Sequence, residues 1–264
     1  MIDQDTFREL KAWFSAYVKS FQSENPAHQR NFDLKEDHTK RVCDEIREIG
    51  NSLALNEEEL RLAGTIALLH DIGRFEQYDR YKTFSDSRSE DHAALGIKVL
   101  SDNGVLNGLD PSTRELIFCA ISNHNRAKLT ESMTEKCLFF TKLLRDADKL
   151  DIWWVVTDYY QRKNEPRNAA LELELPDSPE ISDKICADLM QEKSAHFKYA
   201  KTLNDFKLLQ WGWLYDVNFQ RTFQLIRERR YLEIILKALP RSEKIRKVYS
   251  TLRSYLEKKC QSAS

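Results

Sequence analysis

Apolar side chains recur at three- and four-residue steps along most of the chain. In the opening stretch Phe7, Leu10, Phe14, Tyr17 and Phe21 keep this spacing, which places them on one face of an amphipathic helix. No stretch alternates apolar and polar residues for long enough to predict a strand. The chain has only 7 glycines and 6 prolines in 264 residues, which argues against a turn-rich β architecture. The sequence therefore predicts an all-α fold.

Capping residues and prolines mark the helix boundaries. Asn56 with Glu59 three residues later predicts a capping box for a helix that ends at His70. The segment 74–88 is polar and aromatic without a clean period, and we expect it to be a loop over the functional site. The remaining helices are predicted after Pro26, from His92 behind a Ser89-Glu90-Asp91 cap, from Asp110-Pro111 to about His124, and over 134–160, 180–216, 218–238 and 242–259.

A polar and acidic connector, 166–179, is the best candidate for an internal boundary. We interpret residues 1–165 as a helical core with an N-terminal helix. Residues 166–264 would form a C-terminal helical extension that packs on this core within a single compact domain. No internal repeat or low-complexity segment interrupts either part.

The five cysteines are odd in number, scattered, and without any C-x-x-C pair: Cys43, Cys119, Cys137, Cys186 and Cys260. This pattern predicts reduced thiols rather than a disulfide framework or a thiolate zinc site. No leader segment or apolar run of membrane-spanning length is present, so we expect a soluble, cytoplasmic protein without a membrane partner.

Charge is balanced overall at a net −1, but twelve Lys or Arg stand against four Glu from Arg221 onward. A solvated helix surface explains this segment, and a positive rim that attracts an anionic substrate is the alternative. No nucleic-acid signature accompanies the charge, so a nucleic-acid partner is not expected. The oligomeric state stays open, with a homodimer among the arrangements that the sequence allows.

The main functional information lies in the six histidines. His70 and Asp71 stand side by side at the end of an apolar helical run. At a helix terminus an imidazole nitrogen and a carboxylate oxygen can turn toward one cation. Asp148 stands on an otherwise apolar helix, where burial of an unpaired carboxylate costs several kcal/mol. Taken singly, each of these histidines also fits a hydrogen-bonded structural residue.

The order His38, His70-Asp71, Asp148 resembles the H…HD…D signature of the HD-domain superfamily of metal-dependent phosphohydrolases. The local contexts match as well: H-x-x-R-V from His38, H-D-I-G over 70–73, and Ala-Asp-Lys-Leu around Asp148. The resemblance covers roughly residues 30–160 and implies an HD-type helical bundle. It also implies that these four residues hold one divalent metal. Asp146 is the rival for the role of Asp148, whose assignment depends mainly on this family context.

His92 and His124 go beyond the minimal signature. They fall between the HD pair and the last Asp, as in the H…HD…H…H…D subset of the superfamily that binds two metals. That resemblance implies that Asp71 bridges the ions and that His92 and His124 hold the second. The alternative is one strong metal and a weak second site, with His92 as a helix N-terminal residue and His124 as a capping group.

A donor set of imidazoles and carboxylates without thiolate suits one or two ions of Mn, Fe, Mg, Co or Ni per chain. Such an ion lowers the pKa of water from 15.7 toward roughly 7 and makes hydroxide available at neutral pH. The expected function is a phosphohydrolase, of phosphomonoesterase or phosphodiesterase type, acting on a small phosphorylated substrate such as a nucleotide. One alternative is a mixed-valent di-iron oxygenase, a chemistry found on the same frame. The other is a non-catalytic regulatory helical module, whose natural mark would be a lost ligand.

Cationic residues next to the proposed ligands are candidate phosphate contacts. Arg74 and Lys149 adjoin ligands and are assigned catalytic roles together with Asp71. The residues assigned to substrate binding are Lys35 and Arg41, each one helical turn from His38, and Arg126, just past His124. Asp146 and Asp151 are candidates for orienting a ligand or a cation. Surface ion pairing is the alternative for each cation.

Overall fold

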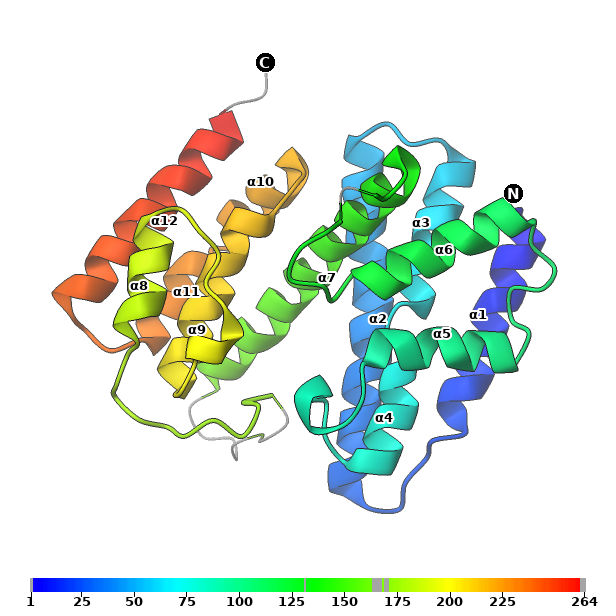
Figure 1. Cartoon of the computed structure of the whole chain (residues 1–264), viewed down its shortest axis with the longest axis horizontal. Coiled ribbons are helices and arrows are strands. Elements are labelled where there is room, and N and C mark those ends of the chain that lie inside the picture. The colour runs from blue at the N-terminus through cyan, green and yellow to red at the C-terminus, as the bar shows by residue number, and fades with distance from the viewer. Residues whose placement is uncertain (1, 131, 163–167, 169–170, 262–264) are drawn as a thin grey trace. The chain divides into compact units, whose positions relative to one another are not determined.

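The computed structural model describes residues 2–130, 132–162, 168 and 171–261. Across these residues it contains twelve α-helices, three short 3-10 helices and no strand (Figure 1). The predicted all-α fold is confirmed. The chain divides into two compact units, residues 1–151 and 152–264. Among the described helices, none has the combination of length and apolarity that crossing a bilayer requires.

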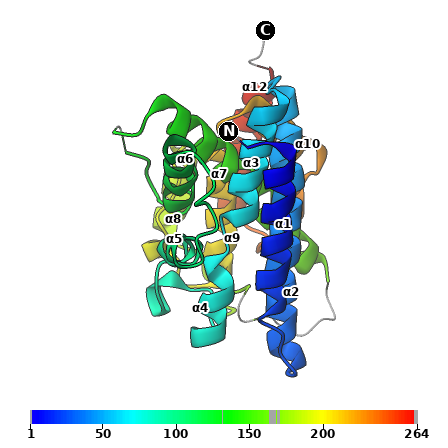
Figure 2. The same cartoon turned by 90° about the vertical axis from the view of Figure 1, so that its right-hand side faces the viewer.

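The first unit is built around α3 (Glu57–Leu69), in which every residue from Leu62 to Leu69 is buried. A helix that is apolar on all sides belongs in a core, and α3 packs against α2, α1 and α6 (Figure 2). The other elements of this unit are α1 (Gln4–Lys19), α2 (Pro26–Ser52), α4 (Gly73–Tyr81), η1 (Asp86–Arg88), α5 (His92–Asp102), α6 (Pro111–Asn123) and most of α7 (Glu135–Gln161).

The predicted helix starts in this unit are confirmed by their caps. The Asn56 side chain accepts from the backbone N–H groups of Glu58 and Glu59, and the Glu59 carboxylate accepts from the Asn56 N–H. Asp91 caps α5 by accepting from the N–H groups of two residues in its first turn. Such a cap stabilises a helix start by about 1 kcal/mol. α5 begins with His92, and α3 is followed directly by His70 and Asp71, which are residues of the site described below.

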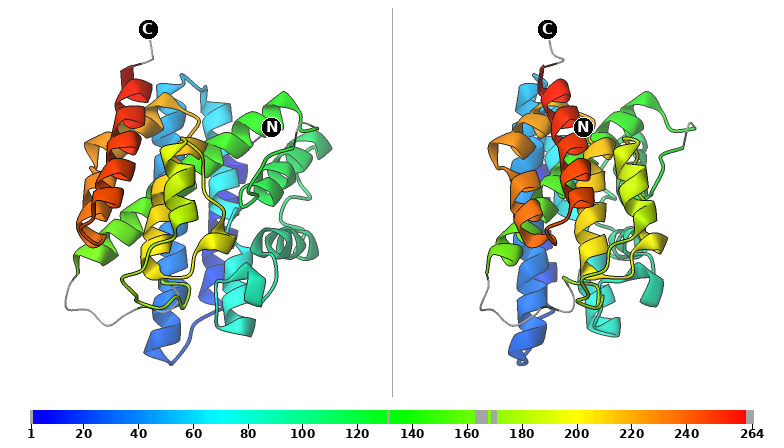
Figure 3. Two further views of the ribbon diagram at one scale, coloured as in Figure 1. Left: turned by 60° about the vertical axis from the view of Figure 1, so that its left-hand side comes forward. Right: turned by 90° about the vertical axis from the view of Figure 1, so that its left-hand side faces the viewer.

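The second unit contains a small bundle in which α12 packs against α8, α10 and α11 (Figure 3). Trp211 is fully buried there and its indole N–H donates to the carbonyl of Leu232. The elements that begin in this unit are α8 (Asp183–Met190), η2 (Phe197–Tyr199), α9 (Leu203–Gly212), η3 (Trp213–Asp216), α10 (Gln220–Glu228), α11 (Tyr231–Ala238) and α12 (Glu243–Gln261).

Three predicted elements are wrong. The segment 74–88 begins with α4 rather than a loop, because Phe75 and Tyr78 are buried at helical spacing among polar neighbours. The predicted helix 180–216 is four shorter elements, and its first break, after Met190, contains Glu192 at φ 57°. The predicted helix 218–238 is two helices, because Arg230 takes the left-handed conformation at φ 58°. The connector 166–179 lies partly outside the described residues, and the proposed division at residue 165 stays a prediction.

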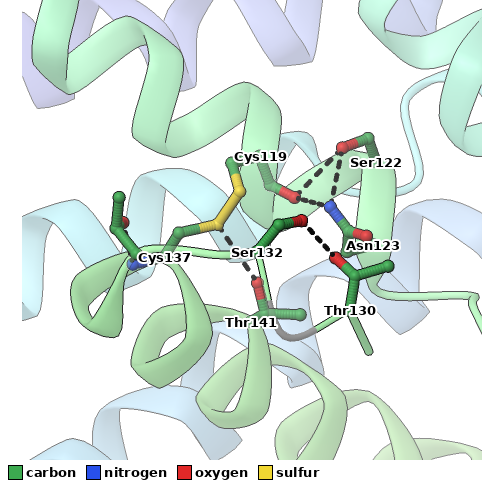
Figure 4. The surroundings of a disulfide bond; sticks show 8 residues. Cys119, Ser122, Asn123, Thr130, Ser132, Cys137 and Thr141 are labelled. Carbon is green, nitrogen blue, oxygen red and sulfur yellow. Dashed lines mark hydrogen bonds between the residues drawn. A yellow bond between two sulfur atoms is a disulfide. The ribbon is translucent and has the colours of Figure 1, made fainter. Parts of the chain in front are cut away.

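The prediction of reduced thiols is wrong for two of the five cysteines. Cys119 of α6 and Cys137 of α7 form a disulfide (Figure 4), whereas Cys43, Cys186 and Cys260 are free. The two partners are 18 residues apart in sequence, and only the folding of α6 beside α7 brings them together. Neither spacing nor a local motif signals the pair.

α4 and α5 are in close backbone contact at Gly73, the glycine of the H-D-I-G run. A Cβ added at Gly73 would collide with the carbonyl oxygen of His92 and lie 2.5 Å from the backbone nitrogen of Gly96. Only a residue without a side chain allows this approach. The glycine thus serves packing, and it holds the first residue of α5 next to the end of α3.

Alkylation of the denatured protein tests the disulfide. Without reductant, iodoacetamide should label three cysteines per chain, and after reduction it should label all five. Intact-mass spectrometry counts the labels, and peptide mapping should find the protected pair at Cys119 and Cys137. Five labels in the unreduced sample would contradict the pairing.

Substitution of the packing glycine should destabilise the first unit. Gly73→Ala forces α4 and α5 apart and should lower the free energy of unfolding by about 1–3 kcal/mol, the usual cost of overpacking. Gly108→Ala is the matched control, because a Cβ there meets nothing within 4 Å. Urea unfolding followed by circular dichroism compares the two variants, and equal stabilities would refute the packing role.

Candidate metal centre

Six side chains from different parts of the first unit converge on one buried region. They fall into three overlapping groups whose potential ligand atoms lie within 4.8 Å of one another. The groups are His38 with His70 and Asp71, His70 with His124 and Asp148, and Asp71 with His92 and His124. The fold therefore brings together all six residues that the sequence assigns to metal binding.

Asp71 lies between two sets of imidazoles. Its Oδ2 atom is 3.5 Å from Nε2 of His38 and 3.8 Å from Nε2 of His70. Its Oδ1 atom is 3.4 Å from Nε2 of His92 and 3.8 Å from Nε2 of His124. The two oxygens of one carboxylate thus face separate ligand sets. We call the set around Oδ2 half-site A and the set around Oδ1 half-site B.

Asp148 of α7 completes half-site A. Its Oδ1 atom is 3.3 Å from Nε2 of His38 and 3.8 Å from Nε2 of His70. Asp146, its rival on the same helix, is buried but belongs to none of the three ligand groups. Half-site A consequently has two histidines and two carboxylates, and half-site B has two histidines and the shared Asp71.

Backbone carbonyls fix the tautomers of two histidines. Nδ1 of His70 is 2.7 Å from the carbonyl oxygen of Ala67, and Nδ1 of His124 is 2.7 Å from that of Ile121. A carbonyl can only accept, so each Nδ1 carries the hydrogen and donates it. In the neutral ring, Nε2 then has its lone pair free and directed to the centre, as a metal ligand requires.

Carboxylates support the other two histidines. Nδ1 of His38 donates to Asp151 at 2.6 Å, and Nδ1 of His92 donates to Asp86 at 2.7 Å. A carboxylate behind a ligating histidine fixes the ring and makes its other nitrogen more basic. The proposed orienting role of Asp151 is consistent with this contact. All four Nε2 atoms are therefore presented to the interior of the site.

Among the residues that the structure describes, the four Nε2 atoms approach carboxylates and one another without satisfactory hydrogen bonds. Those of His38 and His70 are buried without a hydrogen-bond partner, which ordinarily costs about 1–3 kcal/mol each. Those of His92 and His124 are 3.1 Å apart, with lone pairs facing each other unless a proton or cation lies between them. The donor set and its unsatisfied atoms fit divalent cations.

Electrostatics keep Asp71 ionised in this buried position. Burial alone would raise the pKa of Asp71, but the nearby Lys35 and Arg74 cations hold it well below its usual range. Burial lowers the pKa of His70 to about 4, and burial together with the Arg74 cation lowers the pKa of His92 to about 4. These two rings are therefore neutral near pH 7 and available as ligands.

Two of the predicted cationic residues contact Asp71 directly. The Lys35 amine is 2.8 Å from Oδ2, and Nε of Arg74 is 3.6 Å from Oδ1. Burial differs little between them, with 16% and 15% of their side chains exposed. Both therefore stand at the edge of the centre, where an anion could reach them.

The other three predicted cations contact groups beside or behind the candidate ligands. Arg41 pairs with Asp151 through two nitrogens and so supports His38 indirectly. The Lys149 amine is 3.4 Å from the carbonyl oxygen of Arg145 and is largely buried. Arg126 is half exposed and pairs with Asp91 at 3.1 Å. Their roles in catalysis and substrate binding stay predictions.

Two residues that position the site were missed from the sequence. Asp86 lies in η1, inside the segment 74–88 that the sequence predicts to be a loop, and no local motif links it to His92.

Arg145 is the second of these residues. It donates from one guanidinium nitrogen to the carbonyls of Asn123, His124 and Arg126. It thereby closes the end of α6 that carries His124. A basic residue on the apolar helix α7 was the only available signal for it.

Comparison with known proteins identifies one family. Residues 36–153 match a family model described as HD domain. This range contains all six candidate ligand residues. No curated protein and no solved structure matches the chain.

Divalent ions should stabilise the folded protein. An ion that binds the folded state alone raises its stability by about 2.7 kcal/mol at 100 times the dissociation constant. We expect the melting temperature of EDTA-treated protein to rise on addition of Mn²⁺, Fe²⁺, Co²⁺ or Ni²⁺. Asp71→Asn should lose most of this rise, because it weakens both half-sites. An unchanged melting temperature with every ion would contradict the assignment.

Proposed function

Residues 36–153 match the HD-domain family model, and on this premise we propose that the chain is a phosphohydrolase acting on a small phosphorylated molecule. The family consists mostly of metal-dependent hydrolases. Nucleotides are among the candidate substrates, and both phosphomonoesters and phosphodiesters fit the proposal.

The position of Asp71 is the observation that carries this proposal. One buried carboxylate faces two histidine pairs, one on each oxygen. Two ions held by these pairs would supply Lewis acidity toward phosphoryl oxygens and make water nucleophilic at neutral pH. Since all six ligand positions are filled, this arrangement favours an enzyme over a non-catalytic helical module.

The residues of the chain itself would bind and orient the substrate. Lys35 is a point charge on a flexible stem, placed to move from Asp71 to a phosphoryl oxygen. Arg74 approaches the opposite oxygen of Asp71 and is more rigid, because its NH1 group also donates to the Phe84 carbonyl and to Asp86. The two cations therefore lie on opposite sides of the carboxylate. A phosphoryl group bound at the centre would have its negative charge neutralised from both sides.

A screen of phosphorylated compounds tests the proposal. With Mn²⁺ or Co²⁺, the purified protein should release phosphate or alcohol from aryl phosphates and from some members of a nucleotide panel. Asp71→Asn should lower kcat by more than about 100-fold, since even partners behind a metal ligand are worth 10–100-fold. Asp37→Asn on the exposed face of α2 is the matched control and should keep full activity.

The same preparation distinguishes the alternative chemistry. A di-iron oxygenase purified in air would show a mixed-valent iron signal in electron paramagnetic resonance and would consume oxygen. Those results, combined with no hydrolysis of any phosphorylated compound, would overturn the phosphohydrolase proposal.

A further inference from the structure

Asp86 receives hydrogen bonds from three elements that surround half-site B. Its Oδ1 atom accepts from Arg74 NH1 and from Gln77 Nε2, both at 2.9 Å. Its Oδ2 atom accepts from His92 Nδ1 at 2.7 Å and from Asn125 Nδ2 at 3.4 Å. The donors come from α4, from the start of α5 and from the residue after His124. One carboxylate thus links both sides of half-site B.

The backbone around Asp86 is itself fixed by α4. The buried Gln77 amide also donates to Ser89 Oγ and to the Glu90 carbonyl, and Arg74 donates to the Phe84 carbonyl. These bonds span the connection from α4 to α5 on both sides of Asp86. These bonds consequently hold the Asp86 carboxylate in place independently of its contact with His92.

Half-site A has a corresponding arrangement that differs in burial. Asp151 accepts from His38 Nδ1 and pairs with Arg41, as Asp86 accepts from His92 Nδ1 and pairs with Arg74. The Asp151 side chain is 1% exposed, whereas that of Asp86 is 33% exposed. The support of half-site A is sealed between two long helices, and that of half-site B lies on a short connection.

The two half-sites also differ in ligand charge. Half-site A has Asp148 in addition to the shared Asp71, whereas the described group of Asp71, His92 and His124 that forms half-site B has one carboxylate. Asp86 is also grouped with His92, but it contacts Nδ1 of that ring rather than Nε2. A divalent ion in half-site B therefore gains less electrostatic stabilisation and depends more on the basicity of its two imidazoles. His92 owes that basicity to Asp86, because a carboxylate that accepts from Nδ1 makes Nε2 a stronger donor.

We infer that Asp86 is the positioning residue of half-site B and sets whether the second divalent ion is bound, while half-site A fills without it. This inference rests on the two-ion centre of the proposed function. Asp86 acts through His92 and through the end of α6 that bears His124.

Mn²⁺ binding to the metal-free full-length protein tests the inference. Equilibrium dialysis of the wild type should show two ions per chain. Asp86→Asn should keep the affinity of the first ion and weaken that of the second by about 10–100-fold. The electron paramagnetic resonance signal of an exchange-coupled Mn²⁺ pair should appear in the wild type and be absent from the variant at the same Mn²⁺ concentration.

Two further variants separate positioning from general damage. Asp79→Asn is the matched control, because it also replaces a carboxylate by an amide, in this case on α4. Asp79 is exposed, and among the contacts of the described residues it pairs only with Lys82. This variant should bind both ions like the wild type. Asp86→Glu keeps a carboxylate and should bind the second ion more tightly than Asp86→Asn does. Retention of the first ion reports in each case that the site is folded.

Several outcomes would overturn the inference. They are a wild type that binds a single ion, an Asp86→Asn variant with two unchanged affinities, and a variant that loses both ions together. Two ions in the wild type, one of them lost in Asp86→Asn, support it even when no phosphorylated compound is hydrolysed. That last result would count against the proposed function alone.

Discussion

The buried charge of Asp71 is the constraint on which the first unit depends. A carboxylate that is 3% exposed is strongly destabilising unless charges and hydrogen-bond donors surround it. The fold supplies Lys35 on one oxygen and Arg74 near the other, together with four imidazoles. In their neutral form those imidazoles direct Nε2 lone pairs rather than hydrogens to the centre, so the described residues alone leave the arrangement incomplete. This is the physical reason to regard the cluster as a site for cations instead of a polar core.

The surrounding helices bring this cluster together by packing rather than by local sequence. The fully buried α3 delivers His70 and Asp71 to the interior, and the close approach at Gly73 places His92 against them. Arg145 holds the end of α6 on α7 and so fixes His124. Apart from the neighbours His70 and Asp71, each candidate ligand comes from a different segment, and the centre forms only when these packing contacts form.

The sequence predicted the all-α fold, most helices of the first unit and all six members of the cluster. The helices could be predicted because periodicity and caps are local signals, and the six residues could be assigned because their order matches the family signature. The features that could not be predicted from the sequence depend on distant contacts or on backbone conformation. The Cys119–Cys137 pair, the contact from Asp86 to His92 and the left-handed Arg230 have no local signature. α4 was missed because its two buried aromatic residues are surrounded by polar ones.

The four histidines differ in the kind of group that accepts the hydrogen bond from Nδ1, and therefore in which substitutions can change their orientation. His70 and His124 donate to carbonyls three residues earlier in their own helices, and no side-chain replacement elsewhere removes a main-chain acceptor. His38 and His92 instead depend on side chains that a single codon change can replace. Replacement of Asp151 or Asp86 would therefore change the basicity and orientation of His38 or His92, whereas His70 and His124 would keep their main-chain acceptors.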